Sequence, residues 1–66
     1  MKIEYDPKAD AMYIRLALGQ VVESDEVRPG VVLDFDTHGN VLGIEMLDVS
    51  KRTNNPREMS FEMLAP

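Results

Sequence analysis

The sequence predicts a mainly β fold, an antiparallel meander of about five to six short strands with a short helical turn near residues 47–52. Apolar and polar residues alternate through several short runs, which is typical of strands with one buried face. Turn-forming proline, glycine, asparagine and aspartate separate these runs. The 66 residues suffice for one domain with a thin core, in which 1–52 form the body and 53–66 a C-terminal extension.

The first two strands are expected over residues 2–6 and 11–16. In the first, apolar residues alternate with charged ones until the Asp6-Pro7 pair begins a turn. Residues 9–18 are also rich in helix formers, so a helix is the alternative for the second run. The strict period of two favours the strand.

An acidic segment follows. Two valines at 21–22 start a third strand, but the next four residues are Glu-Ser-Asp-Glu. A strand this acidic belongs at the edge of a sheet, where charge discourages pairing with another chain. The alternative is that Glu23, Asp25 and Glu26 form a docking strip for a basic partner protein.

A hairpin over residues 31–36 and 41–46 is the clearest pattern in the chain. In both runs every second residue is a large apolar one, and Pro29-Gly30 supplies a type II turn before them. Its register follows from the side-chain faces, because a shift of one residue moves every side chain to the other face.

Pairing Asp36 with Val41 keeps the apolar residues of this hairpin opposite one another. Pairing Asp36 with Asn40 would bury a charge on one face or expose apolar pairs on the other, so the first register is predicted. It pairs Phe35 with Leu42, Leu33 with Ile44, and Asp34 with Gly43, leaving space beside the Asp34 carboxylate.

The chain beyond the helical turn at 47–52 fits two structures. Asn55-Pro56 is a good helix start, whereas Met59, Phe61 and Met63 alternate as in a strand. We expect a strand, paired either within the domain or across a dimer.

Composition limits the classes of function. The net charge is −5 with scattered basic residues, so nucleic-acid binding by this chain alone is not expected. No apolar run could serve as a signal peptide or a membrane span, and a cytoplasmic protein is expected. The absence of cysteine excludes disulfides, so a domain this small is expected to be a homo-oligomer, with a dimer favoured.

Candidate chemistry is sparse. Asp34, Asp36 and His38 occupy alternate positions leading into a loop, and carboxylates with imidazole can bind divalent metal ions. The alternative is that they are solvated turn residues. No serine lies in a recognisable nucleophile arrangement, so neither enzyme activity nor a cofactor is expected.

Tyr13 and Arg15 are predicted to point away from the apolar face, towards a second surface that includes Val32 and Leu47. Packing beneath the C-terminal extension and a homodimer contact are both open for this surface.

Three segments carry a family resemblance: KIEYDPKADAMYIRL at 2–16, VRPGV at 27–31 and GIEMLDVS at 43–50. Over about residues 1–52 the chain resembles the bacterial domain-of-unknown-function family 2283. The resemblance implies a small β-rich cytoplasmic protein without assigned catalytic or binding residues. It also implies an antitoxin-like or partner-binding role, since members are encoded beside small toxin-like proteins.

The leading hypothesis is therefore a non-enzymatic, self-associating interaction module that binds a small basic protein through Glu23, Asp25 and Glu26. The second hypothesis is a metal- or small-ligand-binding domain that uses the acidic hairpin at 34–38.

Overall fold

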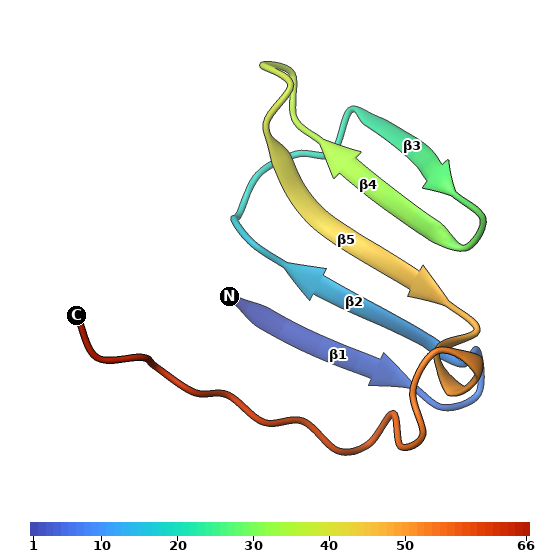
Figure 1. Cartoon of the computed structure of the whole chain (residues 1–66). Coiled ribbons are helices and arrows are strands. Elements are labelled where there is room, and N and C mark those ends of the chain that lie inside the picture. The colour runs from blue at the N-terminus through green and yellow to red at the C-terminus, as the bar shows by residue number, and fades with distance from the viewer.

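The computed structural model describes all 66 residues and contains one antiparallel sheet of five strands (Figure 1). The predicted mainly β fold is confirmed. The elements are β1 (Lys2–Asp6), β2 (Ala11–Arg15), β3 (Glu23–Arg28), β4 (Val31–Phe35), β5 (Val41–Leu47) and the 3-10 turn η1 (Val49–Lys51). The structure has no helix of the length or apolar character needed to cross a membrane.

The strand order is β1-β2-β5-β4-β3, so the sheet is not a simple meander in chain order. The connection after β2 crosses to the far edge, and the chain then returns through β4 to place β5 beside β2 (Figure 1). β5 contains the buried residues Leu42 and Gly43, whereas acidic β3 is exposed almost throughout. Burial therefore favours β5 in the centre and β3 at an edge, as the charge of residues 23–26 predicts.

The hairpin register is confirmed over most of β4 and corrected at its loop end. Leu33 pairs with Ile44 as predicted, but Phe35 pairs with Val41 instead of Leu42, because the register shifts after Asp34.

Loop closure explains the shift. The Asp36 N–H donates to the Asn40 carbonyl at 3.0 Å, which is the loop pairing that the sequence disfavoured. The Asp36 carboxylate also accepts the backbone N–H groups of His38 and Asn40, both at 2.9 Å. The extra residue in β5 restores the alternation beyond the loop, as a β-bulge does, and Leu42 is only 3% exposed.

The predicted turn at Pro29-Gly30 joins β3 to β4, and Gly30 has the positive φ of 75° that this turn needs. Arg52 holds the turn from outside. Its guanidinium donates to the Pro29 carbonyl at 2.7 Å and to the Leu47 carbonyl at 2.9 Å. The start of β4 is thereby tied to the end of β5.

The helical turn expected at 47–52 is present as η1, and its Val49 is 3% exposed. The strand expected in the C-terminal extension is absent within this chain. Residues 59–66 carry no secondary structure, and in Figure 1 they run past β1 in the opposite direction. The alternation of Met59, Phe61 and Met63 was not enough to form a strand, because a strand also needs a backbone partner.

Candidate functional site

One face of the sheet is apolar across four strands. The register places side chains from β1, β2, β5 and β4 directly beside one another in two rows. The first row is Ile3, Ile14, Ile44 and Leu33, and the second is Tyr5, Met12, Met46 and Val31. We call these eight residues the apolar face. Both rows end at charged residues of β3, where Leu33 pairs with Asp25 and Val31 with Arg28.

Nothing in the single chain covers the apolar face. Ile3 is 39% exposed, and the other seven side chains are only half-buried. Only 3 of the 66 residues are buried, and the apolar ones among them are Leu42 and Val49. A sheet normally buries its apolar face against a second layer. Here that layer is missing from the chain.

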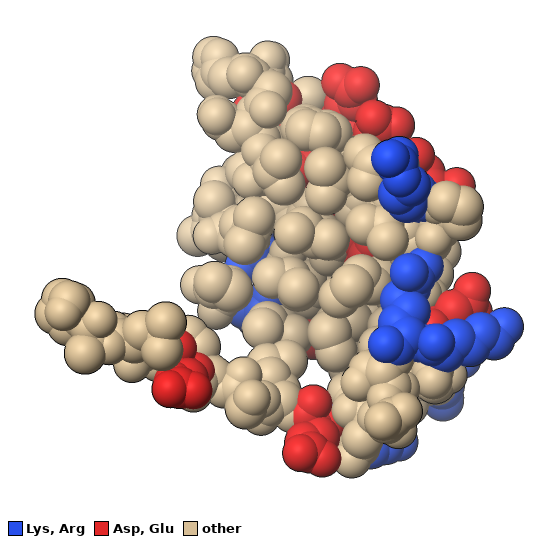
Figure 2. Space-filling view, in the orientation of Figure 1, with Lys and Arg blue, Asp and Glu red and all other residues tan.

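The distribution of charge agrees with this description. Figure 2 looks onto a face whose middle, over β2, β5 and β4, is almost free of charged atoms, while acidic and basic groups are gathered at the rim. The opposite face, which we call the polar face, carries alternating charged residues on the same four strands and on β3. They are Lys2, Glu4, Arg15, Glu45, Asp34 and Glu26.

A hydrogen-bonded cluster occupies the centre of the polar face. Tyr13 donates its hydroxyl to Asp34 at 2.9 Å, and Ser24 donates to the other Asp34 oxygen at 2.5 Å. Burial, followed by the hydrogen bond to the Asp34 carboxylate, raises the pKa of the Tyr13 hydroxyl. The Arg15 guanidinium lies 5.3 Å from the centre of the Tyr13 ring, a cation–π distance.

Gly43 makes this cluster possible. The predicted pairing of Asp34 with Gly43 is confirmed, and the space beside the carboxylate is filled by Tyr13. A Cβ on Gly43 would overlap the Tyr13 ring and hydroxyl. The structure places Tyr13, Arg15, Val32 and Leu47 on the polar face, as predicted.

Asp34, Asp36 and His38 are not brought together. Asp34 is engaged by the cluster on the sheet, whereas Asp36 accepts hydrogen bonds within its own loop. Bonds from the backbone and side chain of Asn40 lower the pKa of the Asp36 carboxyl. The structure forms no group of three potential metal-ligating side chains. Metal binding at 34–38 stays a prediction.

The acidic strip on β3 is fully accessible. Glu23, Asp25 and Glu26 are all exposed. The one ion pair in the structure joins Lys2 to Glu4 at 3.8 Å, so no basic side chain of the chain neutralises the strip. We keep the name acidic strip for these three carboxylates.

A second cluster, which the sequence analysis missed, ties the β1–β2 turn to η1. The carboxylate of Asp10 accepts the Tyr5 hydroxyl at 2.8 Å and the Ser50 hydroxyl at 2.6 Å. The Asp10 carbonyl accepts the Val49 N–H at 3.1 Å. Asp10 has a positive φ of 52°, and an aspartate that tolerates this conformation in a turn was the available signal.

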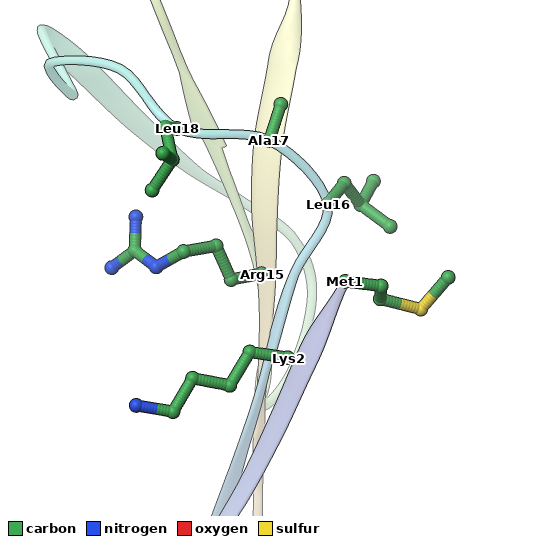
Figure 3. Close-up of a pocket in the computed structure, with 6 residues that line it drawn as sticks. All are labelled: Met1, Lys2, Arg15, Leu16, Ala17 and Leu18. Carbon is green, nitrogen blue, oxygen red and sulfur yellow. The ribbon is translucent and has the colours of Figure 1, made fainter.

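The surface also has an open hollow of about 260 Å³ beside the start of β1 and the end of β2. Figure 3 shows that its lining side chains leave the strands on opposite sides: Lys2 and Arg15 project to one side, and Met1 and Leu16 to the other. Such an arrangement wraps around a sheet edge and does not enclose a ligand.

Two of the comparisons with known proteins are negative: no curated protein and no solved structure matches this chain. The family comparison is positive, because the model of the protein family of unknown function DUF2283 matches residues 2–50. The match ends at Ser50, the residue that closes the Asp10 cluster. It confirms the resemblance seen in the sequence. The chain belongs to the DUF2283 family.

Proposed function

We propose that this protein is a non-enzymatic, self-associating interaction module in which two copies pack their apolar faces against each other. One observation carries the proposal: two rows of aliphatic and aromatic side chains cross four strands, and nothing in the chain covers them. Two apposed sheets about 10 Å apart would form the two-layer core that stable domains have.

Charge positions the interface. The charged residues that end the two rows on β3, Asp25 and Arg28, lie at the rim of the apolar face, where they stay solvated when two copies meet. The polar face, with its alternating charges, remains in water on the outside of the dimer. Packing through the apolar face therefore desolvates no unpaired charge at its centre.

The acidic strip is then the surface available to a different protein. Its carboxylates are exposed and lack basic partners within the chain, so they would attract a basic segment. A dimer that holds a small basic protein in this way would act as an antitoxin-like module.

Light scattering after size exclusion tests self-association. The parent protein is expected at twice its 7.5 kDa chain mass at about 100 µM. Leu33→Lys, on the apolar face, should shift the protein to monomer. Val32→Lys is the matched control, because it lies next in the same strand but on the polar face. Both new lysines would stand opposite an acid, Asp25 or Glu26.

A monomeric parent would overturn the proposal, and so would equal dissociation of the two variants. If circular dichroism shows that Leu33→Lys does not fold, the midpoint of thermal unfolding of the parent protein tests self-association instead. It must rise with protein concentration for a dimer that dissociates on unfolding, and a constant midpoint contradicts the proposal.

A further inference from the structure

The C-terminal segment of residues 58–64 has the features of a strand without a partner. Met59, Phe61 and Met63 are 56%, 83% and 83% exposed. The last backbone hydrogen bond of the chain is the one that Glu58 donates to Asn55 at 3.1 Å. Beyond it, the sequence alternates between apolar and other residues, and its backbone N–H and C=O groups are unpaired. These are the two properties that a segment needs to add to a sheet edge.

β1 offers such an edge, and its outward-facing backbone groups can be identified. Leu16 donates its N–H to Leu42 on the β5 side, so the groups of the preceding residue, Arg15, face β1. Arg15 pairs with Lys2. Because backbone groups alternate between the two edges of a strand, the N–H and C=O of Ile3 point outward.

The two edges of the sheet differ in how receptive they are. β3 carries the acidic strip, which opposes strand addition. On β1, Ile3 and Tyr5 bring apolar side chains to the apolar face and, by the same alternation, both direct free backbone groups outward. An added strand would thus extend the apolar face, and its backbone N–H and C=O groups would form hydrogen bonds with those of β1.

Charge selects one antiparallel register for residues 58–64 on this edge. Pairing Phe61 with Ile3 places Met59 opposite Tyr5 and Glu62 opposite Lys2, a complementary pair, while Glu58 meets Asp6, a like-charge pair, at the end of the strand. A shift of two residues in either direction keeps the faces but sets Glu62 or Glu58 against Glu4 and gives no complementary pair on β1, so only the first register contains one.

We infer that residues 58–64 of each copy add as a sixth strand to the β1 edge of a second copy. In Figure 1 the chain's own segment runs clear of β1, and no backbone hydrogen bond joins the two. The inference rests on the proposed self-association and deepens it.

Interface area favours exchange between copies. Four strands of five residues span about 300 Å² in projection, from spacings of about 4.8 Å and about 3.3 Å. A standard-size interface buries about 800 Å² of accessible surface per partner, so face-to-face contact alone would make a small interface and a weaker dimer. Exchanged segments add Phe61 and Met59 to the two rows of the apolar face and contribute contact of their own.

Disulfide trapping between chains tests the inference, and the natural chain is free of cysteine. The single variants Lys2→Cys, Glu4→Cys, Ser60→Cys and Glu62→Cys are mixed in pairs, oxidised and weighed by intact mass spectrometry. The pairs 2 with 62 and 4 with 60 face each other in the proposed register, at separations that suit a disulfide. They should form mixed dimers at least about tenfold more abundantly than the offset pairs, 2 with 60 and 4 with 62.

Equal trapping of facing and offset pairs would overturn the inference. The double variant Lys2→Cys, Glu62→Cys tests pairing within one chain. If it forms an intrachain disulfide while the mixed single variants form no mixed dimer, the segment pairs with its own β1, and the inference is also overturned. In either case a parent that remains dimeric by light scattering leaves the proposed function standing.

Discussion

Asp10 shows how one side chain connects parts of the chain that are far apart in sequence. It lies in the turn between the first two strands, and Ser50, forty residues later, donates both its hydroxyl and its N–H to the carboxylate. The hydroxyl bonds from Ser50 and then from Tyr5 lower the pKa of Asp10 below its ordinary value of 3.8. The Asp10 cluster, like the Asp34 cluster on the polar face, is built on a carboxylate acceptor.

The sign of this shift sets a pH dependence. A carboxyl group whose pKa is lower in the folded state contributes stability that is present above its ordinary pKa, and that contribution is lost as the pH falls through the folded value. Unfolding by urea should therefore need less denaturant below about pH 4 than at pH 6. In Asp10→Asn the decrease should be smaller, and parent and variant should converge in acid. Parallel curves for the two proteins would contradict this assignment.

Gly43 is the other position where one residue decides a local arrangement. Gly43→Ala should displace Tyr13 and break its bond to Asp34, at a cost of about 1 kcal/mol in the free energy of unfolding. In a Tyr13→Ala background the same substitution should cost much less, because the obstructing ring is gone. Urea unfolding measures both changes. If Gly43→Ala lowers the free energy of unfolding equally in the two backgrounds, the close approach of the Tyr13 ring to Gly43 does not contribute to stability.

At the scale of elements, β4 and β5 show two influences acting on one hairpin. The apolar alternation pairs Leu33 with Ile44, and the sequence predicts this because faces follow from a period of two. The loop closes by a different pairing, in which Asp36 collects three hydrogen bonds. A pattern of apolar residues contains no information about these bonds, so the bulge was not predictable from it.

The edge strand β3 carries the prediction about a partner. Replacing Glu23, Asp25 and Glu26 with lysine should abolish capture of a basic partner from the native host, because attraction becomes repulsion. A matched control is the triple change to glutamine, which removes the charge without reversing it and should weaken capture less. If the charge-reversed variant still captures a stoichiometric basic protein as well as the parent does, the acidic strip is not the partner-binding surface.

At the scale of the whole molecule, one sheet layer does not make a protein core. A 66-residue chain buries only about 60% of its unfolded surface even when compact, and here the only buried apolar residues are Leu42 and Val49. The apolar face has enough aliphatic area for a second layer, and the segment of residues 58–64 has the alternation of another strand. Both features point to a fold completed by association.

The sequence by itself determined the approximate spans of the five strands, the turns between them and the sides of the sheet on which their residues lie. These are local properties, set by the period-two alternation and by residues such as Pro29-Gly30 that suit one turn. Only the tertiary structure decided that β5 lies between β2 and β4 and that Asp10 meets Ser50. It also decided that the last residues find no strand to pair with in their own chain. Each of these depends on competition among edges and partners far apart in sequence, and no local pattern records how such a competition ends.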